Sequence, residues 1–449
     1  MNATSSLAWR SLRHRPLAAT ATFVAVLLGA ALIGSFATLV ESASGARGTD
    51  ADTLVIMGAV VGGWGAVIVL FSVASTVGIT ATQRAAEIGL VRTIGATPRQ
   101  ARKLIVRETA VVAGTAAVAG AATALGAGRL LFDLLQSGGL ITSRTQYGGG
   151  PVSVAAGAAL VLLASSIASA VAARKATRGP AGVLVQSSAA EQSRMAWWRV
   201  AIALLLIGYG IAMAVITIAV TAHDADPYAA MSTSGSSSIL VGVGLAVLAP
   251  VLLRWCATPI GRLVGPFGAS GHLASYNTAR RAHLLAGVLA PVIVLTSAAV
   301  GTLMLVNIDA RSLPAGTPDS DTINLLNNVV VGMISLFAAI MVVNAFVATI
   351  AHRRAELHRL HLLGATARQV RGSVVGEAAI VAAVGVLLGT LASLATVVPF
   401  TVARDEGVVP DGGLWLVPAV VAGVVAVTLG AARGAARSAG NPMVSGAVR

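Results

Sequence analysis

The segment "AELHRLHLLGATARQ" at residues 355–369 repeats the segment "AEIGLVRTIGATPRQ", which stands 269 residues earlier at 86–100. Identical residues continue on both sides at the same shift: Arg84 with Arg353, Arg102 with Arg371, and Glu108 with Glu377. So many matches at one fixed shift indicate an internal duplication. The chain therefore holds two related halves, each with one copy of this polar segment.

The composition is that of a membrane protein. Of the 449 residues, 56% are hydrophobic and only 11% are charged, and the mean hydropathy is +0.84. Soluble domains have an apolar share of roughly 45–50%. The apolar runs are continuous rather than alternating with period two, which indicates helices and not a β-barrel. The predicted fold class is all-α, a polytopic membrane helix bundle.

Ten runs are long enough to cross a hydrocarbon core, which takes roughly 20 residues of helix. They are expected at about 17–40, 53–80, 109–132, 151–173, 198–221, 238–256, 284–306, 324–350, 378–400 and 414–432. The duplication divides them into three parts: a first four-span repeat at 1–180, a central two-span hairpin with its linkers at 181–265, and a second four-span repeat at 266–449. The two repeats have the same orientation and are therefore parallel.

Charge predicts the orientation in the membrane. If the N-terminus is cytoplasmic, 26 of the 31 Lys and Arg residues lie on the cytoplasmic side, whereas 12 of the 17 acidic residues lie outside. This bias is the positive-inside pattern of a multi-pass protein of a cell inner or plasma membrane, with both termini cytoplasmic. The basic residues are spread over short loops at one membrane face, so the high isoelectric point does not indicate a nucleic-acid partner.

Each copy of the polar segment has the pattern of a short helix, a tight turn and a second helix. The first helix carries a one-sided apolar stripe, formed by Ile88, Val91 and Ile94 in one copy and by Leu357, Leu360 and Leu363 in the other. Gly95 and Gly364 follow the stripe, where a left-handed residue ends a helix. Thr97 and Thr366 are then expected to cap the helix that enters the membrane.

The stretches "RAAEIGLVRTIGATPRQ" and "RRAELHRLHLLGATARQ" resemble the cytoplasmic segment of FtsX/MacB-type ABC transporter permeases, and the ten-span layout is similar to the bacitracin-efflux type. In that family the segment is a coupling helix that docks on a separate ATPase subunit. The resemblance implies these docking residues: Glu87, Ile88, Val91, Arg92, Ile94, Gly95, Glu356, Leu357, Leu360, His361, Leu363 and Gly364. Two copies would serve two ATPase subunits per chain. An alternative interpretation is that the segments are amphipathic connectors lying on the lipid surface.

The sequence departs from the family pattern in two ways. Many members carry a large domain outside the membrane, but here the expected outside loops are short: 41–52, 133–150, 222–237, 307–323 and 401–413. None can bury a core of its own. In addition, His361 stands where the first copy has Arg92, so the two docking sites need not be equivalent.

No enzymatic or cofactor site is predicted. The chain has no "GK" dipeptide and therefore no phosphate-binding loop, so any ATP hydrolysis belongs to a partner. His352, His358 and His361 lack a carboxylate or Cys to complete a metal shell. Glu108 and Glu377 are expected to pair with nearby Arg, with a proton relay as the alternative.

Two functions are compatible with these features. The first is a permease that couples ATP hydrolysis by separate subunits to export or extrusion of a hydrophobic or amphipathic substrate, such as a lipid, lipoprotein or peptide. The second is a mechanical transmitter that regulates a sensor kinase or a cell-wall hydrolase and carries no cargo. The short outside loops favour the first, because they offer little surface to an outside partner.

Overall fold

The computed structural model describes residues 16–82, 92–177, 195–224, 229–266, 268–312 and 353–439, with isolated positions between 332 and 350. All regular structure in these residues is helical, which confirms the predicted all-α membrane bundle. The chain forms two compact units: residues 1–193 with 315–330, and residues 194–314 with 331–449. Each unit is described by itself.

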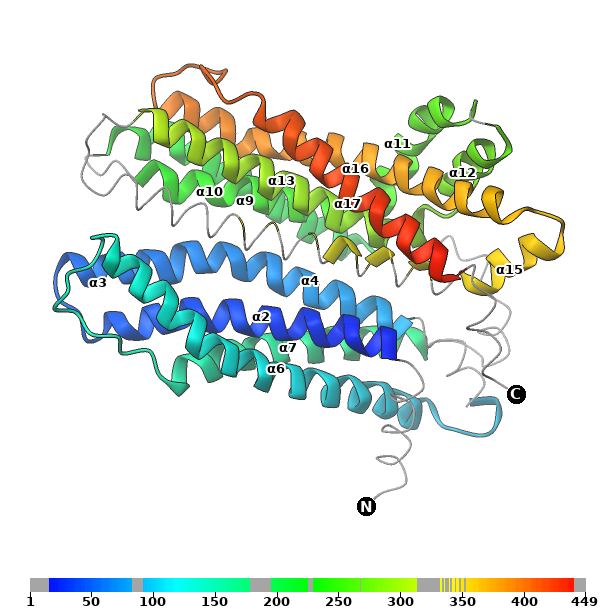
Figure 1. Ribbon diagram of the computed structural model, residues 1–449, viewed down its shortest axis with the longest axis horizontal. Coiled ribbons are helices and arrows are strands. Elements are labelled where there is room, and N and C mark those ends of the chain that lie inside the picture. The colour runs from blue at the N-terminus through cyan, green and yellow to red at the C-terminus, as the bar shows by residue number, and fades with distance from the viewer. Residues whose placement is uncertain are drawn as a thin grey trace. The chain divides into compact units, whose positions relative to one another are not determined.

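The first unit is built around α2 (Pro16–Ala43), which packs against α4, α6 and α7 (Figure 1). Its other elements are α3 (Thr49–Val55), the π-helical turn η1 (Ile56–Val61), α4 (Gly62–Thr82), α6 (Pro98–Ser137) and α7 (Pro151–Ala176). We call the end that carries the polar segment the repeat end of the unit, and the opposite end the loop end.

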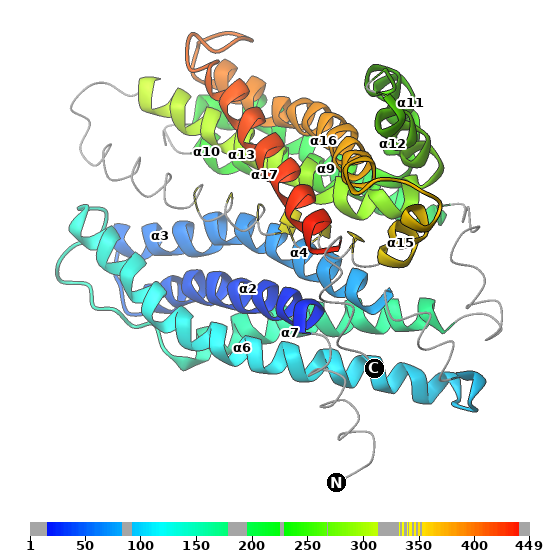
Figure 2. The same ribbon diagram turned by 45° about the vertical axis from the view of Figure 1, so that its right-hand side comes forward.

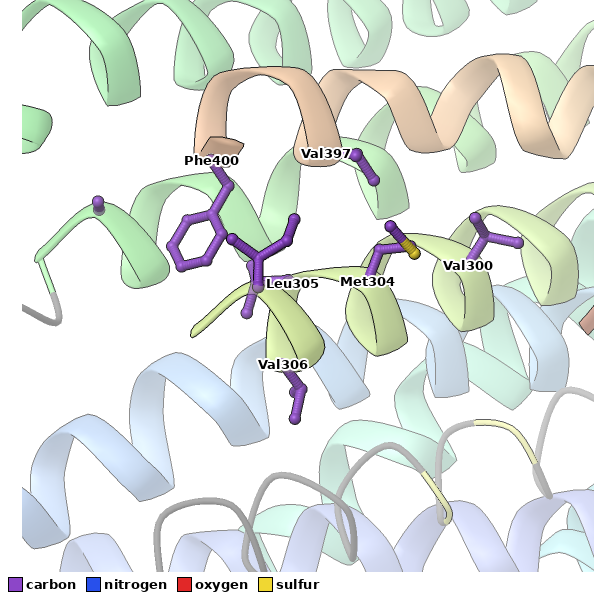
Figure 3. Close-up of a cluster of buried hydrophobic side chains, with 8 residues drawn as sticks. Val300, Met304, Leu305, Val306, Val397 and Phe400 are labelled. Atoms are coloured by element: carbon purple, nitrogen blue, oxygen red, sulfur yellow. The ribbon is translucent and has the colours of Figure 1, made fainter. Parts of the chain in front are cut away.

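The second unit is built around α13 (Ala282–Ser312), which is buried along most of its length. The other elements of the unit are α9 (Trp197–Ala219), η3 (Thr221–His223), α10 (Ala229–Val247), α11 (Ala249–Val264), α12 (Gly268–Arg280), α15 (Arg354–Leu362), α16 (Ala367–Ala403) and α17 (Leu416–Ala439). Near the loop end, Val300, Met304 and Leu305 of α13 meet Val397 and Phe400 of α16 in an apolar cluster (Figure 3).

The duplication is visible in the helix packing. In the first unit a Cβ added to Gly120 of α6 would lie 2.8 Å from the Cβ of Ala30 and closer still to the carbonyl oxygen of Leu27. In the second unit a Cβ added to Gly389 of α16 would lie 2.5 Å from the Cβ of Thr296 and 2.8 Å from the carbonyl oxygen of Ile293. Gly389 stands 269 residues after Gly120. Only glycine permits this close helix approach, and both halves use it at the same place.

Within the described residues eight helices are long and apolar enough to cross a membrane, and eight of the ten expected spans overlap them. The expected span at 53–80 corresponds to the helical stretch formed by α3, η1 and α4. The expected span at 324–350 lies largely outside the described residues, so the total of ten stays a prediction.

The sixth span lies earlier in the sequence than expected. The predicted range was 238–256, but the helix α10 ends at Val247 and a new helix, α11, begins at Ala249. The residue between them, Leu248, has ψ near 0°. Pro250 follows at the start of α11, where its missing N–H group needs no helical partner. Hydropathy alone does not show this break, because apolar residues continue through it.

Hydroxyl groups join α10 to α16 across the second unit. The Ser234 hydroxyl donates to the Thr396 carbonyl oxygen at 2.9 Å, and the Thr396 hydroxyl donates to the Ser234 carbonyl oxygen at 2.7 Å. The Ser238 amide also donates to the Thr396 hydroxyl at 2.9 Å. In the apolar interior these bonds have no water to replace them, so they fix the helix α10 to the second repeat.

We predict that Thr396→Val destabilises the protein by roughly 1–2 kcal/mol, because the interhelical bonds lose their hydroxyl partner. The measurement is the thermal unfolding midpoint in detergent. Thr390→Val is the matched control on the same helix, since the buried Thr390 hydroxyl has no hydrogen-bond partner. Equal losses in the two variants would contradict a specific role for Thr396.

Candidate functional site

The first copy of the polar segment is described from Arg92 onward. Gly95 has φ of 109°, and its amide donates to the Arg92 carbonyl oxygen at 3.1 Å. Thr97 then caps α6: the Gln100 amide donates to its hydroxyl at 3.3 Å, and the Thr97 amide donates to the Gln100 side chain at 2.9 Å. The predicted glycine turn and threonine cap are confirmed. Three predicted docking residues lie outside the described residues: Glu87, Ile88 and Val91.

The second copy has the same geometry. The helix α15 ends at Leu362, Gly364 has φ of 91°, and Thr366 caps α16 with the same reciprocal bonds to Gln369. His361 lies in α15 near its end. The second copy is therefore a helix, a left-handed glycine and a capped helix that leads into the membrane bundle, and the described part of the first copy has the same glycine and the same cap.

The tip of each turn exposes one apolar side chain at the aligned position. Ile94 is 81% exposed and Leu363 is 84% exposed, and each directly precedes the left-handed glycine. Leu357, by contrast, is buried, and Leu360 is half-buried. The predicted stripe of the second copy thus runs from the interior of the protein at Leu357 to the open tip at Leu363. Leu362, which is also exposed, widens the apolar tip.

A buried charge cluster attaches α15 to the rest of the second unit. Arg353, immediately before α15, binds both carboxylate oxygens of Glu377 on α16, and its Nη2 lies 3.0 Å from Oε1. The side-chain amide of Asn277 on α12 donates to the same Oε1 at 3.0 Å. Arg353 and Glu377 are only 6% and 2% exposed. The expected pairing of Glu377 with an arginine is confirmed.

Glu356 extends this cluster onto α15. Its carboxylate binds Arg281, at the start of α13, and lies 3.4 Å from the Nε of Arg353. Burial by itself would raise the pKa of Glu356, but the hydrogen bonds and charges of Arg281 and Arg353 outweigh it and hold the pKa below the ordinary value of 4.5. The charge cluster, defined as Asn277, Arg281, Arg353, Glu356 and Glu377, therefore joins α12, α13, α15 and α16.

In the first unit the polar segment is attached through Thr177, at the end of α7. Arg92 donates to the Thr177 carbonyl oxygen at 3.2 Å, and Arg102 donates to its hydroxyl at 2.8 Å. Glu108, the counterpart of Glu377, is also buried. The duplication did not reveal Thr177, Asn277 or Arg281 as partners. In the alignment of "LAWRSLRHRP" at 7–16 with "LASYNTARRA" at 273–282, Asn277 corresponds to Ser11 and Arg281 to Arg15, and this match is weaker than that of the polar segments.

The helices that follow the tips are much longer than a membrane span. α6 has 40 residues and α16 has 37, which correspond to about 60 and 55 Å at 1.5 Å per residue. A hydrocarbon core is about 30 Å thick. Figure 1 shows both helices running nearly the whole length of their units. Each tip is therefore connected by one continuous helix to the loop end of its own unit.

Among the described residues, no group of three His, Cys, Asp or Glu side chains has the arrangement of a metal site. What the geometry offers instead is a pair of matched apolar tips at the ends of long helices. This arrangement fits the attachment of another protein and the transmission of its movement.

Family comparison agrees with the duplication. The family described as FtsX-like permease C-terminal matches twice, at residues 59–181 and 328–440, and each match contains one copy of the polar segment. The chain belongs to the FtsX-like permease family. As an FtsX-like permease it is a multi-pass membrane subunit of an ABC transporter of the FtsX/MacB type and works with ABC ATPase subunits. No curated protein matches the chain.

We predict that Arg353→Met destabilises the permease by about 3–5 kcal/mol, because it leaves the buried Glu377 carboxylate without its partner. The double variant Arg353→Met/Glu377→Met should recover most of this loss, since no uncompensated charge remains. Thermal unfolding of the detergent-solubilised protein measures both. Arg359→Met, which changes an exposed arginine of α15, is the control and should have little effect. A double variant as unstable as the single one would contradict the pairing.

The depressed pKa of Glu356 predicts a pH dependence of stability on the acid side. Because the folded-state pKa lies below 4.5, the ion pairs contribute fully above that pH and are lost as the pH falls through the folded pKa. Glu356→Gln should therefore be less stable than the wild type at neutral pH, and the difference should shrink below 4.5. Unfolding midpoints measured over a pH series test this. A difference that does not change with pH would rule out an ionised Glu356 as its source.

Proposed function

We propose that the two tips dock two ATPase subunits and that the chain exports or extrudes a hydrophobic or amphipathic substrate, such as a lipid, lipoprotein or peptide. The matched exposure of Ile94 and Leu363 is the observation that supports docking most directly. A large apolar side chain that is exposed at the same position of two duplicated turns is suited to bind in a groove on a partner protein.

The docking surface that we propose contains the predicted residues of both copies except Glu356 and Leu357. In the first copy it includes Arg92, Ile94 and Gly95, together with Glu87, Ile88 and Val91 from sequence alone. In the second copy the contact is centred on Leu363 and Gly364, with Leu360 and His361 beside them. Glu356 and Leu357 face the protein interior and would act by holding α15 in place.

We further propose that the repeat ends face the cytoplasm of a cell with the permease in its inner or plasma membrane and both termini inside. The repeat end of α6 carries Arg99, Arg102, Lys103 and Arg107, whereas Asp50 and Asp52 lie at the loop end of the same unit. This distribution follows the positive-inside pattern. Nucleotide-driven movement of the ATPase subunits would then be transmitted along α6 and α16 to the outer leaflet.

An apolar groove in the first unit supports a hydrophobic substrate. It has a volume of about 450 Å³, lies among α2, η1, α4 and α7 near the loop end, and is within the usual range of ligand sites. Its walls include Phe36, Val40 and Val152. Glu41 lies at its edge, where its carboxylate accepts a hydrogen bond from the Gly150 amide at 2.9 Å. Such a groove suits one hydrocarbon chain of an amphipathic molecule.

The alternative function is a mechanical transmitter that regulates a sensor kinase or a cell-wall hydrolase without cargo. The described loops at the loop ends, such as 138–150 and 404–415, are short, which favours transport. A purified complex whose ATP hydrolysis is stimulated by a lipid or peptide would support the export function. Stimulation only by an outside protein would support the alternative.

We predict that the double variant Ile94→Asp/Leu363→Asp abolishes copurification of the ATPase. Each change would bury an unpaired carboxylate in the docking interface, at a cost on the order of several kcal/mol. The measurement is the amount of ATPase retained on the purified permease and its rate of ATP hydrolysis.

The matched control is Val408→Asp/Val409→Asp, which places the same charges at exposed apolar positions at the loop end. The control should retain the ATPase and its activity. If the tip variant also retains both, the tips are not docking sites, and the interpretation as connectors on the lipid surface would replace the proposal.

The duplication predicts the stoichiometry. One chain with two tips should assemble with two ATPase subunits, with its halves related by a pseudo-two-fold axis along the membrane normal. Native mass measurement of the purified complex should give one permease chain and two ATPase chains. A mass that contains two permease chains for each ATPase pair would contradict this assembly.

A further inference from the structure

The helix α11 has one buried face and one exposed face. Its buried residues follow each other at intervals of four: Ala249, Leu253, Ala257 and Gly261. They face the helices on which α11 packs, namely α12, α13 and α16. On the opposite face Trp255 is 72% exposed and Leu263 is 74% exposed. These two side chains share the exposed face with Arg254 and Arg262.

The position of α11 fits the surface of a membrane rather than its interior. The spanning helix α10 ends at Val247, and the break at Leu248 redirects the chain. Figures 1 and 2 show α11 and α12 at the repeat end of the second unit, with α11 turned away from the direction of α10 and α13. A helix with an exposed Trp, an exposed Leu and flanking arginines is typical of an in-plane helix at the lipid interface.

The segment formed by α11 and α12 carries only positive charge. Residues 249–281 contain four arginines and no acidic residue. Arg281 is occupied by Glu356, and Arg280 donates to the Tyr276 hydroxyl at 2.6 Å. In the part of the chain that the structure describes, no carboxylate forms an ion pair with Arg254 or Arg262. Both guanidinium groups are therefore available to phosphate groups outside the protein.

We propose that the exposed face of α11 binds the anionic headgroups of the inner leaflet, with Trp255 and Leu263 inserted among the lipids and Arg254 and Arg262 on the phosphates. Anionic lipids supply the charge that this face lacks, and zwitterionic lipids do not. The proposal rests on the orientation given under the proposed function, which places the repeat end at the cytoplasmic leaflet.

Lipid binding at α11 would also stabilise the charge cluster, because α12 connects the two. A Cβ added to Gly376 of α16 would lie 2.8 Å from the Cβ of Ala274 on α12, and one added to Gly261 would meet the Ser275 side chain. The helix α12 is thus held tightly between α11 and α16. Asn277, at the end of α12, donates to Glu377 in the charge cluster. Anionic lipid therefore stabilises the arrangement that holds α15, and ATP hydrolysis by the complex should rise with the anionic fraction.

The single cysteine of the chain, Cys256, lies beside Trp255 and provides the probe. The complex would be labelled at Cys256 with an environment-sensitive fluorophore and placed in phosphatidylcholine nanodiscs that contain about one-fifth phosphatidylglycerol. Two samples would be compared: in one the phosphatidylglycerol carries brominated chains, which quench the fluorophore, and in the other the phosphatidylcholine carries them. Brominated phosphatidylglycerol should quench several-fold more per molecule than brominated phosphatidylcholine. In Arg254→Gln/Arg262→Gln this preference should disappear, and the stimulation of ATP hydrolysis by phosphatidylglycerol should fall about tenfold or more.

The matched control, Arg433→Gln/Arg437→Gln, removes two exposed arginines of α17 at the same end of the unit and should keep the preference. Three results would overturn the proposal: equal quenching by the two lipids in the wild type, an equal loss in the control, or loss of ATPase copurification in the α11 variant. The last result would mean that the ATPase covers this face. If the wild type fails to retain any ATPase, the proposed function fails, while the quenching preference still tests α11 independently.

Discussion

The buried pairing of Arg353 with Glu377 constrains the second half of the molecule. The Glu377 carboxylate is only 2% exposed, and a buried charge that loses its partner is strongly destabilising. Arg353 supplies that partner from the residue before α15, so the start of α15 is held against α16 in the folded protein. Asn277 and Glu356 satisfy the remaining polar atoms and bring α12 and α13 into the same cluster. In the proposed function, movement of the tip would therefore move α12, α13 and α16 as well.

In the orientation that we propose, this attachment would let a short cytoplasmic segment act on the far side of the membrane. The left-handed glycine and the capping threonine form a short, defined turn between the tip and the long helix that follows. The close glycine contact between α13 and α16 would then pass a movement of α16 to the centre of the unit. The first unit has the same turn and the same glycine contact, but it ties the segment to α7 through Thr177. The two halves thus have similar tips but differ in the contacts that hold the tip: hydrogen bonds to Thr177 in the first unit and the charge cluster in the second.

The sequence predicted those features that depend on local rules. The turn at Gly95 and Gly364, the caps at Thr97 and Thr366, and the helical class follow from backbone preferences and hydropathy. The break after α10 was missed because Leu248 and Pro250 interrupt an apolar run without changing its hydropathy. Burial of Leu357 was also missed, since periodicity shows that residues share a face but not which neighbour covers that face. The partners Asn277 and Thr177 come from distant elements, and no local pattern identifies them.

We propose that α15 and α16 move as one body when the ATPase binds nucleotide. Spin labels in a Cys256→Ser background test it directly, with one pair at Arg359→Cys and Arg371→Cys, which are exposed on α15 and α16. A second pair at Arg99→Cys and Arg368→Cys reports the separation of the two long helices near their tips. ATP should change the distance distribution of the second pair and leave that of the first pair unchanged. A change between α15 and α16, with no change between the long helices, would contradict it.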